Sequence, residues 1–432
     1  MGISPLWMFP ILLALVLLGI PVAFSLMGLA LAFGYQVFGG AVVHQFIGRI
    51  NSIATNFELA CVPLFIFMGA MLERSGIAEK LFQAMHLWTR RLPGGLAIGT
   101  LVMCVIFAAS SGVIGATETI VGLLAIPTML RHNYSKPLIS GVICAGGSLG
   151  TIIPPSIAVV ILAPLANTSI GDLFAGILVP GLMLTFFYML YVFAVATIRP
   201  ETAPRLEEDF KPVAMREKFE ITLKALVPPM VMILCVLGSL FAGLASPTEA
   251  SALGALGGFV LSALYGRLTL AVLHQALLKT LKVTSMIMLL IVGGSMFTGV
   301  FVAGGGASIM EGVIQSLSFG SYGTLIFVLF LAFLGGFFLD WISILLIFIP
   351  VFIPLMAKQG FETNWLCVLF LLIVQTSYLT PPMAPAIFYF RGVAPPEIGV
   401  KDVLRGVVPF IFLQLLAIAL VILFPALVNW WE

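Results

Sequence analysis

Charged residues are scarce in this 432-residue sequence, and their scarcity excludes an ordinary soluble protein. Asp, Glu, Lys and Arg make up 9% of the chain, whereas roughly a quarter is usual in soluble domains. Hydrophobic residues make up 61%, and the mean hydropathy is +1.18. We therefore expect an integral membrane protein. The formal net charge is only +2 and the basic residues are scattered, so no nucleic acid partner is expected.

Disulfide patterns, metal-ligand spacings and catalytic motifs are also missing. The five cysteines all lie in apolar segments, so we expect small buried residues and no disulfide; they are Cys61, Cys104, Cys144, Cys235 and Cys367. The sequence holds no Gly-Lys-Ser or Gly-Lys-Thr loop for ATP phosphates, and no nucleophile has a base at usable spacing. These absences argue against an enzyme, a cofactor and a metal centre.

Long uncharged apolar runs are what the chain has in abundance. A helix that spans a bilayer needs about 20 apolar residues. Several runs exceed that length, namely 92–117, 137–171, 283–310, 363–390 and 406–431. The runs are continuous and rich in Leu, Ile, Gly and Ala. We therefore predict an all-α polytopic membrane protein, with the lipid bilayer as its surroundings.

The sequence repeats its landmarks in two halves. Matching residues recur in the same order at offsets of 226 to 230, in the pairs Pro21 and Pro247, Gly69 and Gly299, Pro127 and Pro354, Pro154 and Pro381, and Asp172 and Asp402. Residues 1–198 and 225–432 are therefore expected to form two repeats. The hydrophilic segment 199–224, with six basic and six acidic residues, is expected to be a cytoplasmic linker.

The basic residues near the ends of the apolar runs indicate that the two repeats are inverted. Basic residues flank the run 92–130 on both sides, and a hairpin that turns at 108–112 keeps both flanks in the cytoplasm, although two full spans would satisfy the charges as well. The equivalent flanks in the second half, 319–323 and 358–362, are uncharged or balanced and are expected outside. In other pairs of equivalent loops, too, the loop of one half is rich in basic residues and its counterpart in the other half is not.

Each repeat is thus predicted to hold about five spans, a re-entrant hairpin and a broken helix, with both termini in the periplasm. The hairpins are expected at about 92–130 and about 324–357, and the broken helices at about 137–168 and about 364–390.

Two Pro-Pro pairs interrupt the apolar runs, in GGSLGTIIPPS at 146–156 and in QTSYLTPPM at 375–383. Proline has no backbone N–H and cannot continue a helix, so each pair frees carbonyl groups, which lipid does not tolerate unless protein or a watery cavity receives them. Inverted repeats with broken helices are typical of secondary transporters, which bind ions and substrate at the breaks. Carbonyls and hydroxyls suit Na⁺, and half-helix N-termini suit an anionic group.

Three acidic residues lie in apolar surroundings, where an ionisable side chain is a functional hypothesis by default. Asp340 follows Gly335 by five residues, and an ion or substrate site and a structural pairing role are equally open for it. Glu118 belongs to the first hairpin and could instead face a neighbouring helix. Glu249 is better interpreted as a first-turn acid at a helix N-terminus. Arg391 is interpreted as a cytoplasmic anchor rather than an anion ligand.

A single Ser or Gly in a membrane helix is more often structural, because Ser bonds its own helix and Gly allows close packing. The recurrence of four polar interruptions at matching places in the two halves favours a binding site.

In its ordered motifs, the sequence resembles the large membrane subunit of tripartite ATP-independent periplasmic (TRAP) transporters, the DctM type. The matching motifs are AASSG, AGGSLGTIIPPSI followed by GDLFAGILVPG, SPTEAS, and FLGGFFLDWISILLIFIPVFIPL followed by LTPPM. The resemblance covers essentially the whole chain. It implies an elevator transporter of the bacterial inner membrane, driven by inward Na⁺. It also implies a separate small membrane subunit (DctQ type) and a periplasmic binding protein (DctP type) that delivers an organic acid.

The resemblance also assigns site residues. The candidate Na⁺ ligands are Ser110, Ser111, Gly112, Gly147, Thr151, Pro154, Gly336, Asp340, Ser377, Thr380 and Pro381. The candidate substrate contacts are Ser148, Pro155, Ser156, Thr376, Pro382 and Met383. Tyr378 is bulkier than the small residues expected at this place, which leaves the size of the substrate pocket open.

We therefore expect Na⁺-coupled uptake of a carboxylate compound, such as a dicarboxylate or sialic acid, with no cofactor besides the coupling ion. The alternative is a stand-alone ion-coupled organic anion carrier or exporter. An intramembrane enzyme or a structural membrane protein is a third class, and it would show no Na⁺ dependence.

Overall fold

The computed structural model describes residues 4–89, 91–111, 115–204, 214–317 and 319–431. All regular elements in these residues are helices, so the predicted all-α class is confirmed. Within the same residues, five helices are long and apolar enough to cross a membrane, or six if the bent pair Phe57–Arg74 and Ile77–Thr89 counts as one span. Shorter apolar helices fill the space between them, including Trp341–Ala357 and Thr363–Leu379.

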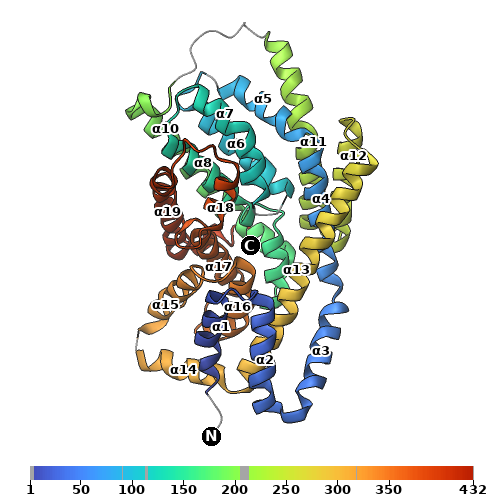
Figure 1. Cartoon of the computed structure of the whole chain (residues 1–432), viewed down its shortest axis with the longest axis vertical. Helices are drawn as coiled ribbons and strands as arrows, with labels where there is room; N and C mark the ends of the chain where they lie inside the picture. The colour runs from blue at the N-terminus through green and yellow to red at the C-terminus, as the bar shows by residue number, and fades with distance from the viewer. Residues whose placement is uncertain (1–3, 90, 112–114, 205–213, 318, 432) are drawn as a thin grey trace.

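The helices follow a repeated order along the chain (Figure 1). The first half contains α1 (Met8–Leu17), α2 (Val22–Phe38), α3 (Val42–Ala54), α4 (Cys61–Arg74), α5 (Ile77–Thr89), α6 (Gly95–Ser111), α7 (Ala116–Arg131), α8 (Lys136–Ser148), α9 (Ile157–Ala166) and α10 (Ile170–Ile198). The second half contains α11 (Met215–Phe241), α12 (Pro247–Leu264), α13 (Leu270–Ala303), α14 (Gly306–Leu317), α15 (Gly320–Gly335), α16 (Trp341–Ala357), α17 (Thr363–Leu379), α18 (Pro385–Val393) and α19 (Val400–Leu423).

Proline marks equivalent helix starts in the two halves. Pro21 is the N-cap of α2, and Pro247 is the first residue of α12. Proline is well placed there because the first helical N–H groups have no partner within the helix. The two halves differ at one point, since α3 and α4 are separate helices whereas α13 is continuous over 34 residues.

The helix pairs α6–α7 and α15–α16 lie in different parts of the molecule. Each pair is in contact along its length. In Figure 1, α6 and α7 lie in the upper part, near α5 and α8, and α15 and α16 lie in the lower part, near α1 and α14. Hairpins that enter a membrane from opposite sides would be arranged in this way. That the repeats are inverted stays a prediction.

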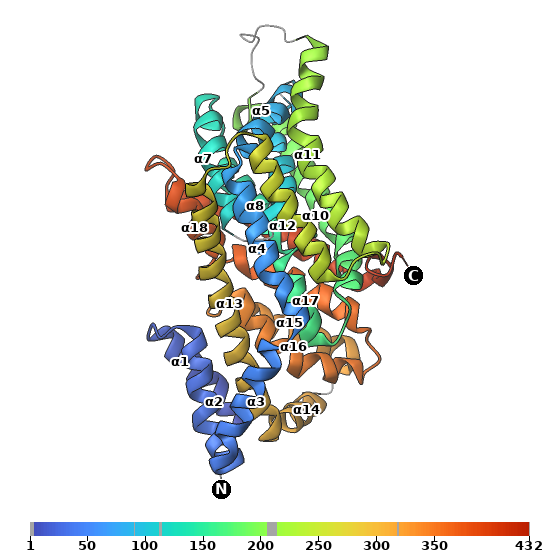
Figure 2. The same ribbon diagram turned by 90° about the vertical axis from the view of Figure 1, so that its right-hand side faces the viewer.

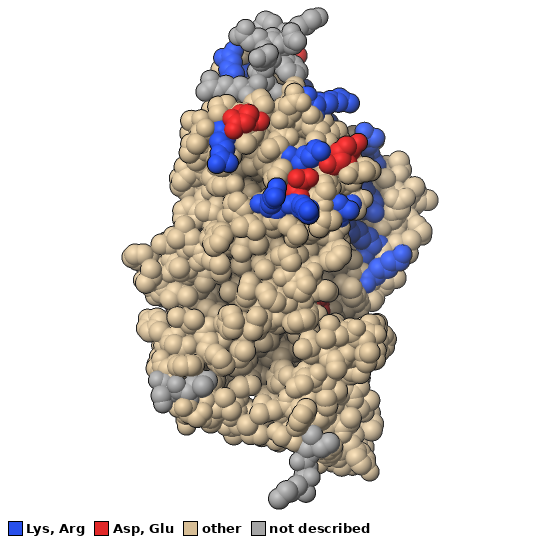
Figure 3. All heavy atoms as spheres, turned by 60° about the vertical axis from the view of Figure 1, so that its left-hand side comes forward, with Lys and Arg blue, Asp and Glu red and all other residues tan. Residues whose placement is uncertain are grey.

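Charged side chains gather at one end of the molecule. On the face drawn in Figure 3, Lys, Arg, Asp and Glu lie over the upper half. Helix α11 also begins at the upper end, and the N-terminus lies at the lower end (Figure 1). Because Lys and Arg favour the cytoplasmic side, this distribution favours a cytoplasmic upper end. The C-terminus lies at about half height in Figure 2, and the periplasmic location of both termini stays a prediction.

The centre of the structure is formed by α8, α9, α16 and α17. Every residue of α17 from Trp365 to Leu379 is buried, and so is every residue of α8 from Leu138 to Ser148. A helix whose residues are buried on all sides is surrounded by other helices. α17 indeed contacts α8, α9, α10, α15, α16, α18 and α19. The two broken helices are thereby held in the interior.

Opposite sidedness of the two hairpins can be tested by labelling. Arg131, at the end of α7, and Ser321, at the start of α15, are both exposed. We expect Arg131→Cys to react with a membrane-impermeant maleimide only from the cytoplasm and Ser321→Cys only from the periplasm. The background should carry Cys235→Ser, because Cys235 is the exposed cysteine of the native chain. Reaction of both positions from one side would rule out inverted repeats.

Candidate functional site

The first break separates α8 from α9. α8 ends at Ser148, a single turn follows at Leu149–Thr151, and the peptide bond between Pro154 and Pro155 is cis. Ser156 then starts α9, because its Oγ accepts a hydrogen bond from the Ala158 N–H at 3.2 Å. All residues from Leu149 to Ser156 are buried. The break is therefore enclosed by protein, as freed backbone in a membrane requires.

The second break separates α17 from α18. α17 ends at Leu379, and the peptide bond between Pro381 and Pro382 is again cis. Ala384 then adopts a left-handed conformation, with φ of 34°, before α18 begins. Unlike the first break, this one reaches the surface of the described chain, where Met383 is 43% exposed. The two breaks are thus alike in local sequence but differ in exposure.

Hydroxyl groups at both breaks donate to carbonyls of their own helices. The Thr151 Oγ1 donates to the Ser148 carbonyl at 2.9 Å, and the Thr380 Oγ1 donates to the Thr376 carbonyl at 2.8 Å. The Ser377 Oγ donates to the Val374 carbonyl at 2.7 Å. A hydroxyl has one proton to donate and two lone pairs. With the proton used, the lone pairs of these oxygens remain available for a cation.

The α6–α7 hairpin packs on the glycine-rich end of α8. A Cβ atom at Gly147 would lie 2.2 Å from the Cδ of Glu118, so only glycine allows this approach. Glu118 therefore faces a neighbouring helix, at the end of α8 where the first break begins. Its Oε2 accepts the Gly115 N–H at 2.8 Å, and its Oε1 is buried with no hydrogen-bond partner among the described residues. This carboxyl group thus lies directly beside the first break.

The end of α15 packs on α17 in a similar way. A Cβ atom at Gly336 would lie 2.2 Å from both the Cβ and the Oγ of Ser377. Asp340 follows and caps α16, where its carboxylate accepts the N–H of Ile342 at 3.2 Å, the N–H of Ser343 at 3.4 Å and the Ser343 hydroxyl. The side chain of Asp340 thus has a capping role at the second break.

Three helix N-termini line one cavity of about 520 Å³. The first residues of α9, α16 and α18, namely Ile157, Trp341 and Pro385, all contribute to its wall. Asp340, Tyr378 and Tyr389 add polar atoms, and α2 and α13 close the opposite side. The volume lies in the range of small-molecule pockets. Helix N-termini carry a partial positive charge; that of α16 is capped by the Asp340 carboxylate, so the N-termini of α9 and α18 are the ones that suit an anionic group.

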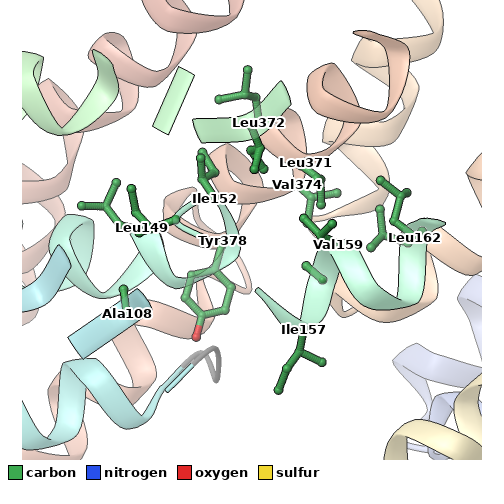
Figure 4. Close-up of a cluster of buried hydrophobic side chains, with 14 of the residues drawn as sticks. Ala108, Leu149, Ile152, Ile157, Val159, Leu162, Leu371, Leu372, Val374 and Tyr378 are labelled. Atoms are coloured by element: carbon green, nitrogen blue, oxygen red, sulfur yellow. The ribbon is translucent and has the colours of Figure 1, made fainter. Parts of the chain in front are cut away.

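The two broken helices contact each other directly at a buried polar pair. The Gln375 Nε2 donates to the Ser148 Oγ at 3.2 Å, and both side chains are fully buried. The two residues are 227 positions apart, which is also the offset between the Pro-Pro pairs. Figure 4 shows buried apolar side chains of the same two helices and breaks, with Leu149 and Ile152 of the first break near Tyr378 of α17.

Sequence comparison identifies the family to which this arrangement belongs. Residues 9–427 match the family described as the DctM component of tripartite ATP-independent periplasmic transporters. The chain belongs to the DctM family. A C4-dicarboxylate TRAP transporter large permease protein of Pseudomonas aeruginosa is 30% identical over 410 residues, which are 94% of each chain. An isethionate TRAP transporter permease protein, DctMQ, of Oleidesulfovibrio alaskensis is 26% identical over 411 residues, which are 95% of this chain and 63% of that longer protein.

The fold of this DctM-family chain is also similar to a solved transporter structure. The YdaH transporter of Alcanivorax borkumensis superposes with a TM-score of 0.61 at 18% identity, over 92% of this chain and 88% of that one. A likeness at this identity concerns the fold alone. It agrees with a polytopic helical transporter fold.

The residues predicted to bind Na⁺ in this DctM-family chain fall into two groups. Ser110, Gly147, Thr151 and Pro154 lie at the first break, and Gly336, Asp340, Ser377, Thr380 and Pro381 lie at the second. The Ser110 Oγ donates to the Phe107 carbonyl at 3.0 Å. Gly112 and the side chain of Ser111 lie outside the described residues. In the described part of the chain, no group of three His, Cys, Asp or Glu side chains is close enough to hold a metal ion. The ligand roles stay predictions.

The predicted substrate contacts do not gather around the cavity. Ser148, Ser156 and Thr376 are buried, and their hydroxyls donate to backbone carbonyls. Pro155 is buried, whereas Pro382 and Met383 are exposed. Of all the residues predicted for the site, Asp340 lines the cavity, and their roles toward substrate stay predictions.

Several functional candidates carry no clear signal in the sequence. Tyr389 lines the cavity although nothing in its sequence surroundings marks it, and Tyr378 lines it although it was notable only for its bulk. Gln375 has a signal in the repeat offset, which it shares with the prolines.

Two charged residues singled out in the sequence have structural contacts. Glu249 accepts the Ser246 N–H at 2.8 Å and caps α12 as a first-turn acid. Arg391 donates to the Ile398 carbonyl at 3.0 Å and supports the loop after α18.

The close approach of Gly336 to Ser377 predicts a sharp difference between two adjacent glycines. Gly336→Ala would force a methyl group into Ser377 although the backbone there, with φ of −68°, accepts alanine without strain. We expect a loss of about 1–3 kcal/mol from overpacking, measured as a lower midpoint of thermal unfolding in detergent. Gly335→Ala is the matched control, because its nearest neighbours lie 3.4 and 3.5 Å away in the Phe348 ring. Equal midpoints for the two variants would contradict this packing.

Proposed function

We propose that this DctM-family chain is the permease of a Na⁺-driven uptake system for an organic acid. The observation that carries the proposal is the cavity onto which α9, α16 and α18 direct their N-termini, with a break or hairpin end beside each of them. Such a cavity offers partial positive charge to an anion. The breaks offer oxygen ligands to a cation. Symport of an organic anion with a cation needs both.

Na⁺ fits the chemistry of the breaks. The oxygens present are hydroxyl lone pairs and backbone carbonyls, which are hard neutral ligands. A monovalent cation held by neutral oxygens leaves a small net charge in the interior. Each break lies against the end of a hairpin, at Gly147 and at Gly336, so occupation of either site affects how closely the hairpin packs.

An organic acid fits the cavity. The relative from Pseudomonas aeruginosa is named for C4-dicarboxylates and the relative from Oleidesulfovibrio alaskensis for isethionate, and both compounds are small anions. We assign this chain a small carboxylate as its substrate. Tyr378 and Tyr389 supply hydroxyls that orient it, while the helix N-termini receive its charge.

The position of the cavity supports an elevator mechanism. Helices α2 and α13 line one side of it, and the elements next to the breaks line the other. In the proposed mechanism, the hairpins and broken helices move as one body against the group of helices that includes α2, α4, α12 and α13, whose members contact one another. The cavity then opens to either side of the membrane without separate gates.

The family description implies partner subunits. The DctMQ relative is longer than this chain, which matches 63% of it, and its name combines the two membrane components. We propose that this chain works with a separate DctQ-type small membrane subunit and a DctP-type periplasmic binding protein in a bacterial inner membrane. A stand-alone carrier or exporter is the alternative.

Uptake by purified protein in liposomes separates the two possibilities. We expect uptake of a labelled organic acid only with an inward Na⁺ gradient, the small subunit and the substrate-loaded binding protein all present. Omission of each component in turn provides the controls. Full-rate uptake of free substrate by this chain alone would refute the tripartite arrangement, and equal uptake with choline in place of Na⁺ would refute Na⁺ coupling.

The Thr380 hydroxyl provides a side-chain test of the ion site. Thr380→Val removes the hydroxyl at nearly constant shape, and we expect the Na⁺ concentration for half-maximal uptake to rise about tenfold, since a contact to a charged group contributes about 1.5 kcal/mol or more. Thr128→Val is the matched control, because the part-buried Thr128 Oγ1 also donates to a carbonyl four residues earlier, that of Leu124 at 3.1 Å, near the end of α7 opposite to Glu118. An unchanged Na⁺ dependence in Thr380→Val would remove this residue from the site.

A further inference from the structure

A second cavity of about 580 Å³ lies along the same two helices as the first. It is lined by α13 from Ser295 to Ala303 and by α16 at Leu346 and Pro350, whereas the first cavity touches α13 from Val283 to Leu290 and the start of α16. Helix α13 runs from the middle of the molecule toward its lower end (Figure 2). On α13 the two linings are separated by the step from Leu290 to Ser295, which is about 1.4 helical turns, and the second cavity lies toward the lower end.

Arg49 is the basic residue of this second cavity. It belongs to α3 and is the first Lys or Arg in the sequence. The next one is Arg74. Its guanidinium lies over Gly299 of α13, where a Cβ atom would be 3.3 Å from the Nη2. Arg49 forms no ion pair with any described residue, and no acidic side chain is among the described residues that line the cavity.

The position of Arg49 runs against the usual distribution of basic residues. Lys and Arg are biased toward the cytoplasmic side, and the argument from charge places this end of the molecule outside. Arg49 is exposed, so its guanidinium does not require a buried partner, and because it lines the cavity an anion that enters can reach it. The planar guanidinium matches a carboxylate through two parallel hydrogen bonds. Gln45, Ser295 and Thr298 add polar groups to the wall.

We propose that the cavity around Arg49 is an outer anion site, which receives a carboxylate from the periplasmic side before it reaches the deeper cavity. The inference rests on the proposed function, because it assigns a first stop to the same transported acid. The Thr298 Oγ1 donates to the Leu346 carbonyl at 3.1 Å and joins α13 to α16 in the wall of the outer cavity. Movement of α16 against α13 must break this bond, and that movement connects or separates the two sites.

Protection of an introduced cysteine tests the outer anion site directly. Gln45 lines the cavity and is exposed, so Gln45→Cys, in a Cys235→Ser background, should react with an impermeant maleimide from the periplasmic side. The intact membrane complex in phosphatidylcholine vesicles is used, with succinate as the probe and neutral succinamide as its control. We expect succinate to slow labelling and succinamide to have no effect.

Removal of the guanidinium should weaken this protection. With Arg49→Gln, the succinate concentration that halves the labelling rate should rise about tenfold or more, as expected for loss of charge-assisted hydrogen bonds. The succinate concentration for Arg49→Lys should lie between those for Arg49 and Arg49→Gln, because lysine keeps the charge but not the paired donors. Lys401→Gln is the matched control: it removes one exposed positive charge from α19, away from the cavity. Absence of protection by succinate, or equal protection in Arg49→Gln, would overturn the proposal.

An anionic lipid head group presents the same chemistry as a carboxylate from another source. If phosphatidylglycerol vesicles protect Gln45→Cys without succinate, and phosphatidylcholine vesicles do not, the cavity is a lipid site and the proposal is wrong. Uptake measured on the same preparations distinguishes failure of the outer anion site from failure of the proposed function. Organic acid uptake that persists with unchanged half-saturation in Arg49→Gln overturns the outer anion site alone, whereas absence of uptake by the native complex overturns the proposed function.

Discussion

Freed backbone groups in a lipid environment are the constraint on which this structure depends. The pairs Pro154-Pro155 and Pro381-Pro382 each follow the end of a helix, and the carbonyls freed there must be covered or hydrogen bonded, whereas the pair Pro228-Pro229 lies inside the continuous helix α11. The chain meets this need with its own hydroxyls, such as those of Thr151 and Thr380, and with hairpins that lie against the breaks. Close coverage is possible because Gly147 and Gly336 have no side chains at the contact points. The motifs that look like defects in a helix therefore determine where the hairpins pack.

The same arrangement of broken helices and hairpins brings together groups that suit charges of both signs. Helix C-termini and hydroxyl lone pairs collect at the breaks, and the N-termini of α9, α16 and α18 collect around one cavity. A transporter that carries an anion with a cation needs these two environments close together but distinct. The breaks also differ from each other, since the first is buried and the second reaches the surface near Met383. Access to the two breaks is therefore unequal in the conformation described, and the contact between Gln375 and Ser148 links the two broken helices.

The fold class and the family were predictable from the sequence, because they depend on local and ordered features. Apolar run length dictates helices, and the Pro-Pro pairs dictate where α8 and α17 end. The partners of individual side chains were not predictable. The Glu118 contact with Gly147 and the location of Tyr389 in the cavity depend on how helices rotate against each other, and spacing along one helix carries no information about that. Arg49 shows the limit most clearly, since its cavity is built from five helices, α2, α3, α9, α13 and α16, most of which are distant in sequence.

The central claim is that the breaks bind Na⁺, and the most direct measurement is the thermal stability of the purified chain as a function of Na⁺ at constant ionic strength. A ligand that binds only the folded state raises its stability in proportion to the logarithm of the ligand concentration once the sites are saturated. Binding at the breaks predicts that the unfolding midpoint rises with Na⁺ in place of choline and rises less in Thr380→Val. A midpoint that is the same in Na⁺, K⁺ and choline would contradict it.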